Sequence, residues 1–347
     1  MTDHAVARRA LIKGAGLGVG AGFAAAITPA HAERLAAAAT ADTAPAAIWS
    51  AEYWAHKGDV KLYMFRKRMG APAASAKPLP VLFLVHGSSL SSRSSYDLRV
   101  PGKGEYSLMD VFAGYGFDVW TMDHEGYGRS SRTQGNSDIA SGVEDLKAAM
   151  EVLKRETGRG RYHFFGESSG SIRAGAFAQN DPERVDRLIL TAFTYKGNGA
   201  AEIERRQQHI AELRANPRRR RDAAMVHSIF SRDGHPEIYD PAVADALVAS
   251  EMQFGDAVPS GTYLDMAANL PLVDPTRVTA PVLMTRGEWD GNSTNDDLLA
   301  FFRQLPNGDR QFTILPDTAH SEVFSKNRHL LFYAMKNFLA APAPVAS

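Results

Sequence analysis

A serine between two glycines, placed directly after an apolar run, is the feature that most constrains how this chain folds. Residues 162–165 (YHFF) have the apolar character of a buried strand, and residues 166–170 (GESSG) follow at once. Glycine permits a sharp turn from strand to helix at little steric cost, and such a turn holds a serine hydroxyl above a sheet. The pattern predicts that Ser168 is a nucleophile.

A serine nucleophile needs a base, and the base needs a carboxylate that orients it. The apolar run 281–285 is followed by Asp290, and the run 311–315 is followed by His320. Both side chains come just past predicted strands, where an open α/β sheet gathers its reactive groups. We predict a triad of Ser168, Asp290 and His320, with Glu288 and Asp317 as alternative orienting acids.

Two backbone N–H groups are expected to stabilise an oxyanion. Residues 81–85 (VLFLV) form a short apolar run of the kind that buried parallel strands show, and His86-Gly87-Ser88-Ser89 follows it. We predict that one N–H comes from Ser88 in this loop and the other from Ser169, directly after the nucleophile. Asp123, within a further strand-and-turn segment, is interpreted as part of the scaffold.

With these motifs in this order, the chain resembles the serine-nucleophile branch of the α/β-hydrolase family over roughly residues 48 to 340. The resemblance implies an α/β fold with a mostly parallel eight-stranded sheet, helices on both faces and a helical cap insertion. It also implies hydrolysis through an acyl-enzyme. A serine at the elbow differs from the aspartate of the similar haloalkane dehalogenases and epoxide hydrolases.

The first 32 residues have the pattern of an export signal. Arg8-Arg9 precedes a weakly apolar Gly/Ala-rich run that ends at Ala30-His31-Ala32, which has the form of a cleavage site. We expect residues 1–32 to be a twin-arginine-type signal peptide, residues 33–47 a leader segment, and the mature protein to be periplasmic or secreted.

Composition excludes several classes of function. The chain of 347 residues has no cysteine, and 39 basic residues balance 39 acidic ones. We therefore expect no disulfide, no thiolate metal site, no cofactor and no nucleic-acid partner. Its partners should be a small-molecule substrate and the export machinery, without stable membrane insertion.

The fold is expected to divide into a core, residues 48–193 and 275–347, and a cap, residues 194–274. An opening hairpin is predicted over 48–68 and a helix over 138–157. In the cap, Ala200–Ala215 and Pro241–Met252 have helical character. The run Arg218–Arg221 indicates a solvated helix face, with a site that attracts anionic substrates as the alternative.

The substrate pocket is predicted to involve Ser89, Glu167, Met225, Phe254 and Tyr263. The apolar cap residues among them could equally form the small core of the cap itself. Glu167 is expected to pack or hydrogen-bond behind the nucleophile.

These patterns predict a serine hydrolase, most specifically a carboxylic ester hydrolase. The same triad also serves lactonases, amidases, carbon–carbon bond hydrolases and cofactor-free perhydrolases, and the fold does not separate these activities. A non-catalytic binding protein on the same scaffold is a rival from another class, but such proteins often lack a triad member.

Overall fold

The protein is described by a computed structural model over residues 47–75 and 77–342. The predicted signal peptide, residues 1–32, and the predicted leader up to residue 46 lie outside the described residues. None of the helices in the described part of the chain is both long and apolar enough to cross a membrane.

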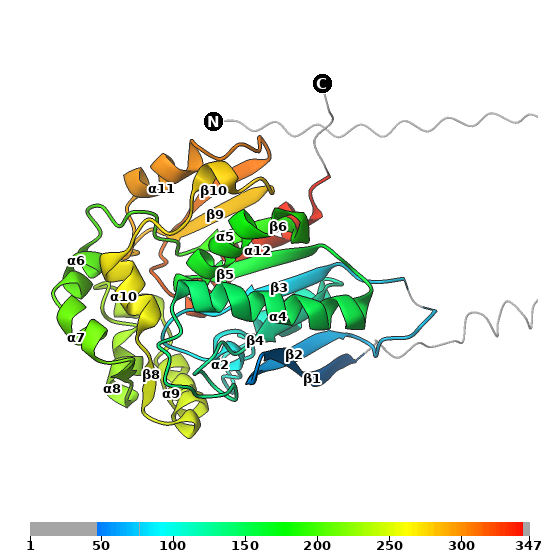
Figure 1. The fold of residues 1–347 in the computed structure, drawn as a ribbon, viewed down its shortest axis with the longest axis horizontal. Coiled ribbons are helices and arrows are strands. Elements are labelled where there is room, and N and C mark those ends of the chain that lie inside the picture. The colour runs from blue at the N-terminus through cyan, green and yellow to red at the C-terminus, as the bar shows by residue number, and fades with distance from the viewer. Residues whose placement is uncertain (1–46, 76, 343–347) are drawn as a thin grey trace, which may run out of the picture. The chain divides into compact units, whose positions relative to one another are not determined.

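A mostly parallel sheet of eight strands forms the centre of the described residues, as the sequence predicted (Figure 1). The strand order is β1-β2-β4-β3-β5-β6-β9-β10. β2 is antiparallel to both of its neighbours, and the other pairs are parallel. The strands are β1 Ile48–Lys57, β2 Val60–Met69, β3 Val81–Val85, β4 Asp118–Met122, β5 Tyr162–Glu167, β6 Val185–Thr191, β9 Val282–Gly287 and β10 Arg310–Leu315.

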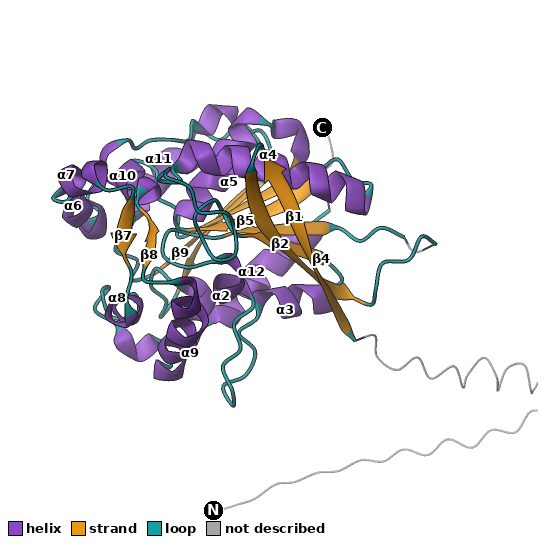
Figure 2. Ribbon diagram, turned by 60° about the horizontal axis from the view of Figure 1, so that its bottom comes forward, coloured by secondary structure: helices purple, strands orange, loops and turns teal. Residues whose placement is uncertain are grey.

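Helices cover both faces of this sheet (Figure 2). Side chains alternate along each strand, so that Phe83 and Phe164 face one apolar core while Leu82 and Phe165 face the other. The core helices are α2 Ser92–Tyr96, α3 Leu108–Gly114, α4 Ile139–Thr157, α5 Ser169–Asn180, α11 Asn295–Phe302 and α12 Arg328–Ala340, with 3-10 helices η1 Pro182–Arg184, η4 Pro275–Arg277 and η5 Glu322–Phe324.

The sequence of α4 explains its ends. The Asp138 carboxylate caps the first turn by accepting the Ser141 N–H at 2.8 Å. Gly158 ends the helix with a φ of 67°, a left-handed conformation that glycine adopts at little cost. The predicted helix over 138–157 is therefore confirmed, and it packs against α5 and β1.

Residues 194–274, predicted as a helical cap, leave the sheet after β6 and rejoin it before β9. Their helices gather at one end of the sheet (Figure 1). The segment also contains a two-stranded antiparallel pair that the sequence did not predict. Its elements are α6 Ala201–Gln207, α7 Ile210–Ala215, β7 Arg218–Arg220, α8 Ala223–Ser228, η2 Pro236–Ile238, α9 Pro241–Glu251, η3 Met252–Phe254, β8 Ala257–Pro259 and α10 Gly261–Ala268.

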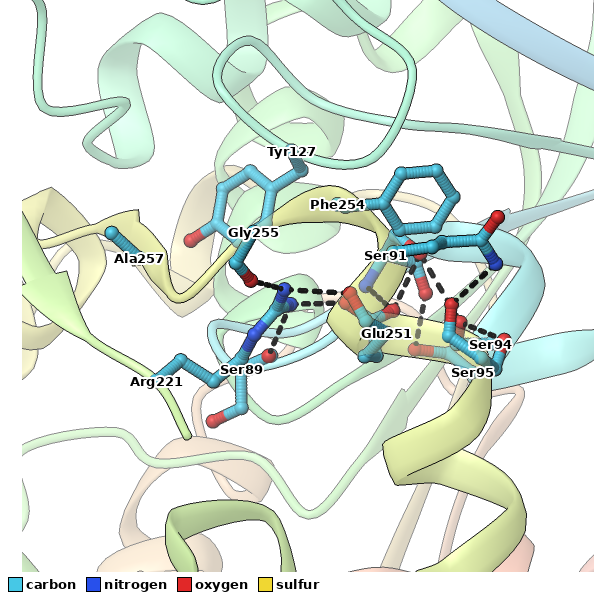
Figure 3. Close-up of polar contacts among 12 residues, drawn as sticks. Ser89, Ser91, Ser94, Ser95, Tyr127, Arg221, Glu251, Phe254, Gly255 and Ala257 are labelled. Atoms are coloured by element: carbon cyan, nitrogen blue, oxygen red, sulfur yellow. Dashed lines mark hydrogen bonds and ion pairs between the residues drawn. The ribbon is translucent and has the colours of Figure 1, made fainter. Parts of the chain in front are cut away.

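The interpretation of Arg218–Arg221 as a solvated helix face is wrong. The first three arginines form β7, and Arg221 is buried in an ion pair with Glu251 at the end of α9 (Figure 3). The Arg221 guanidinium also donates to the carbonyl oxygens of Glu251 at 3.0 Å and of Gly255 at 2.8 Å. A buried guanidinium with these acceptors fixes β7 against α9, and no local pattern in the sequence indicates such a distant partner.

Candidate active site

Ser168 lies at a sharp turn between β5 and α5. Its backbone has φ 58° and ψ −128°, a region that non-glycine residues seldom adopt. Gly170 permits the close packing of this turn, because a Cβ there would lie 2.1 Å from the Val85 carbonyl oxygen. The strained residue is held by its neighbours, as is common where a reactive side chain is presented.

The predicted triad residues lie in one hydrogen-bonded chain. His320 Nε2 is 2.9 Å from Ser168 Oγ, and His320 Nδ1 is 2.9 Å from Asp290 Oδ1. His320 follows β10 and Asp290 follows β9, so both come from the carboxyl ends of parallel strands. The arrangement can deprotonate the serine hydroxyl and stabilise the resulting imidazolium.

Asp290 is buried and ionised. Burial alone would raise the pKa of its carboxyl group, but His320, the Asn292 N–H and Arg286 together lower that pKa below its usual value. The Asn292 N–H donates to Asp290 Oδ1 at 2.8 Å. The carboxylate is thus fixed in position and charge beside the imidazole.

The two alternative acids lie elsewhere. Glu288 Oε2 accepts the Asp317 backbone N–H at 3.0 Å in an exposed position. In the described residues, Asp290 is the carboxylate that contacts the His320 imidazole.

The residues predicted to supply the oxyanion N–H groups lie beside each other. Ser88 Oγ donates to Ser169 Oγ at 2.7 Å, and Thr262 Oγ1 of α10 donates to Ser88 Oγ at 2.8 Å. Ser169 is the first residue of α5, where backbone N–H groups have no helical acceptor. These contacts bring the loop after β3 and the start of α5 together next to Ser168.

His86, at the start of the loop after β3, connects this loop to the segment after β4. It is buried, and its Nε2 accepts the His124 backbone N–H at 3.0 Å, which requires the uncharged imidazole. Burial lowers the pKa of His86 well below its ordinary value. His124 in turn contacts Asp145 Oδ2 at 3.0 Å. No local sequence pattern indicates these contacts, because His86, His124 and Asp145 are far apart in sequence.

Two buried acids, Glu167 and Glu322, lie near Asp290. Burial raises the pKa of Glu167 to about 8 and raises the pKa of Glu322 well above its ordinary value. Glu322 Oε2 accepts the Thr285 hydroxyl at 2.7 Å. Glu167, predicted to pack behind the nucleophile, also lines the cavity at Ser168.

A cavity of about 50 Å³, the inner cavity, opens at Ser168 and His320. Of the predicted pocket residues, Ser89, Glu167 and Tyr263 line it. Met225 instead lines a neighbouring cavity of about 220 Å³, the cap cavity, which shares Ser89 and Tyr263 with the inner one. The inner cavity is also lined by Arg206, Ile229, Arg232 and Phe324, which no local pattern in the sequence indicates.

The prediction that Phe254 lines the substrate pocket is wrong. Phe254, Ser91 and Ser94 are labelled in Figure 3, and all three line a cavity separate from the inner one. Glu251 accepts the Ser91 N–H at 2.6 Å, so the end of α9 is fixed against the loop after β3. The short helix η3 that follows α9 is thereby directed to this separate cavity.

The sheet order, the elbow and the strand-end side chains define the α/β-hydrolase class. The model of the family described as serine aminopeptidase, S33, matches residues 100–327, more than half of the chain. The chain belongs to this family.

Individual relatives are similar over parts of their length. A proline iminopeptidase of Neisseria gonorrhoeae is 31% identical over 190 residues, 51% of this chain and 57% of the relative. A 2-hydroxy-6-oxononadienedioate/2-hydroxy-6-oxononatrienedioate hydrolase of Paraburkholderia phymatum is 34% identical over 112 residues, 31% of this chain and 34% of the relative. The matches thus span between a third and just over half of these curated relatives.

Solved structures extend the likeness to nearly the whole fold. A thermophilic esterase from Thermogutta terrifontis superposes with a TM-score of 0.58 at 20% identity, covering 83% of this chain and 98% of that one. An E-2-(acetamidomethylene)succinate hydrolase superposes with a TM-score of 0.60 at 17% identity, covering 84% of this chain and 100% of that one. At this identity the likeness concerns the fold alone.

Proposed function

We propose that the protein is a serine hydrolase that cleaves a carboxylic ester through an acyl-enzyme. The observation that carries this proposal is the continuous contact from Ser168 Oγ to His320 to Asp290, with both distances 2.9 Å. Membership in a hydrolase family and relatives that carry hydrolase names also support it.

In the proposed reaction, His320 Nε2 takes the hydroxyl proton as Ser168 Oγ attacks the ester carbonyl carbon. The backbone N–H groups of Ser88 and Ser169 stabilise the negative oxygen of the tetrahedral intermediate, and Asp290 stabilises the imidazolium. The intermediate collapses when the carbon–oxygen bond to the alcohol breaks and His320 returns the proton to the leaving oxygen. Water, deprotonated by His320, then attacks the acyl-enzyme, and the carboxylic acid leaves as Ser168 regains its proton.

An ester is the substrate class that we propose for these residues. The leaving alkoxide needs one proton, and the imidazolium beside Ser168 supplies it. The other bonds that family relatives cleave are tested by the same assay, with an ester, a lactone and an amide of equal acyl length offered to the purified protein.

Ser168→Ala should remove nearly all turnover and leave the fold intact, because it deletes one partly exposed oxygen. Losses in serine triads reach about a millionfold, since the members act as a unit. Ser50→Ala, an exposed serine of β1, is the control and should retain full activity. Labelling by a fluorophosphonate probe should occur in the parent and in Ser50→Ala alone; activity of Ser168→Ala within about tenfold of the parent would overturn the assignment.

We also propose that residues 194–274 act as a cap and that the protein is exported. The cap proposal is supported by Tyr263 and Arg206, which reach the inner cavity from α10 and α6. Export is supported by the Arg8-Arg9 pattern and the A-x-A sequence at 30–32.

A further inference from the structure

The inner cavity adjoins the cap cavity, and the two share part of their walls. Arg206, Arg232 and Tyr263 line both the inner cavity and the cap cavity. A third cavity, of about 370 Å³, shares Arg206, Arg219 and Tyr263 with the cap cavity and lies further along the cap. A substrate whose carbonyl is at Ser168 therefore has room to extend beneath α6 and β7.

Positive charge dominates the wall of the cap cavity. Among the described residues, four arginines line it, Arg205, Arg206, Arg219 and Arg232, and Glu202 is the one carboxylate that does. Glu202 is already engaged, with Arg205 at 2.9 Å and with Arg206 at 3.3 Å. The other two arginines, Arg219 and Arg232, form no ion pair in the described residues, although the charge of Arg232 also helps to lower the pKa of the Glu202 carboxyl group.

One carboxylate, Glu202, thus faces four guanidinium groups, and Arg219 and Arg232 are the two that form no ion pair with it. Arg219 lies over the ring of Tyr263, with 4.2 Å from its guanidinium carbon to the ring centre, and forms no ion pair in the described residues. Arg232 also forms none there, and its Nε is buried without a hydrogen-bond partner. Both arginines are half-buried, and placing unpaired cations side by side out of bulk water is unfavourable, so an anion from outside the chain would be bound favourably between them.

The acids near Ser168 do not provide that anion. Asp290 is paired with His320, and Glu167 favours its uncharged form at neutral pH because it is buried. The positive charge of the cap cavity therefore remains available to a ligand.

We propose that the cap cavity is a subsite for a carboxylate group of the substrate, with Arg232 and Arg219 as its principal ligands. The inference rests on the proposed function and specifies it: the ester carries a carboxylate remote from the scissile bond. A guanidinium matches a carboxylate by two parallel N–H···O bonds. The same charges disfavour substrates with an ammonium group, such as the free amino terminus of a peptide.

The test compares esters that differ in one charge. Mono-para-nitrophenyl esters of dicarboxylic acids, from succinate to suberate, are each paired with the para-nitrophenyl ester whose second carboxylate is methyl-capped. A para-nitrophenyl ester with a trimethylammonium group is the cationic member. We expect kcat/KM for the anionic ester to exceed that of its capped partner by about tenfold at one or more chain lengths, because charge-assisted hydrogen bonds to the carboxylate form.

Variants of Arg219 and Arg232 test whether these two side chains cause the preference for the anionic ester. Arg232→Gln and Arg219→Gln should each reduce the ratio of kcat/KM for the anionic ester to kcat/KM for the capped ester severalfold. Arg232→Lys should preserve part of this ratio, because lysine keeps the positive charge but lacks the paired N–H donors of the guanidinium. Arg220→Gln is the matched control: Arg220 adjoins Arg219 on β7, is exposed and pairs with Asp222. This control should leave the ratio unchanged.

The outcomes separate the two proposals. A ratio near one at every chain length, while capped esters turn over and Ser168 is labelled, overturns the carboxylate subsite and leaves the hydrolase proposal standing. A high ratio that Arg219→Gln, Arg232→Gln and Arg232→Lys do not change overturns the assignment to these arginines. Absence of turnover and labelling with all esters overturns the proposed function itself.

Discussion

At the scale of single residues, Asp290 favours the tautomer of His320 in which Nδ1 carries the proton. The carboxylate accepts from Nδ1, which leaves Nε2 free to take the Ser168 proton. In Asp290→Asn the charge is lost, and the amide can donate to Nδ1 and favour the wrong tautomer. We predict a fall in kcat of about ten-thousandfold for a short ester, with little change in the far-ultraviolet circular dichroism.

Glu288→Gln and Asp317→Asn are the controls for that prediction. These residues contact each other through Glu288 Oε2 and the Asp317 N–H, away from the imidazole. Both variants should retain most of the parent kcat. If either were inactive while Asp290→Asn kept its rate, the orienting acid would be misassigned.

Glu167 should make stability decrease with rising pH. Burial raises its folded-state pKa to about 8 from an ordinary value of 4.5, so the folded state holds a proton that the unfolded state releases. Its contribution is fully present below pH 4.5 and is lost as pH rises toward about 8. Glu167→Gln, which mimics the protonated acid, should therefore stabilise the protein more near pH 8 than near pH 4.5.

Thermal unfolding of the parent and Glu167→Gln across this pH range measures the effect. The difference in thermal unfolding midpoint between Glu167→Gln and the parent should widen by a few degrees toward pH 8. Each kcal/mol in the free energy of unfolding corresponds to roughly 2–4 °C. Glu183→Gln, at an exposed glutamate, is the control. A gap that stays constant or narrows toward high pH would contradict the buried, protonated state of Glu167.

At the scale of elements, the Arg221–Glu251 pair ties the β7–β8 ribbon and α9 to the loop after β3 (Figure 3). Both side chains are buried, and Glu251 Oε1 also accepts the Ser91 hydroxyl at 2.5 Å. Arg221→Met leaves a buried carboxylate without its cation. We predict a loss of about 3–5 kcal/mol in the free energy of unfolding, measured by denaturant titration.

Two further variants isolate the charge in that prediction. Arg220→Met, at the exposed neighbour in β7, should change stability by less than about 0.5 kcal/mol. The double variant Arg221→Met with Glu251→Gln removes the unpaired charge and should recover part of the loss. Equal stability of Arg221→Met and Arg220→Met would mean that the ion pair contributes little to holding the cap segment.

The elements also show what the sequence could and could not predict. β3 and β5 were predicted because strands buried on both faces are continuous apolar runs bounded by glycine turns. The three-residue strands β7 and β8 were missed, because Arg218–Arg220 has no periodicity and pairs only with a distant segment. Short polar strands depend on tertiary contacts, which a local pattern does not contain.

At the scale of the whole molecule, the site is assembled from three distant positions in the chain. Ser168, Asp290 and His320 follow β5, β9 and β10, whose carboxyl ends lie at one edge of the parallel sheet. Their order and strand-end position were visible in the sequence. Arg206 and Arg232 were not, because the tertiary packing of residues 194–274 brings them to the inner cavity.

The N-terminal segment, residues 1–32, precedes every strand and helix of the described core, and we propose that it directs export. A twin-arginine signal is recognised by a receptor, so its recognition depends on the arginine side chains and not on their charge alone. Replacing Arg8 and Arg9 by lysine preserves the charge and should block export, while the cytoplasmic precursor keeps an intact Ser168 site. Fractionation of cells that express each form, with amino-terminal sequencing of the exported protein, tests this. The exported form should begin near Glu33, and efficient export of the double-lysine variant would contradict the twin-arginine assignment.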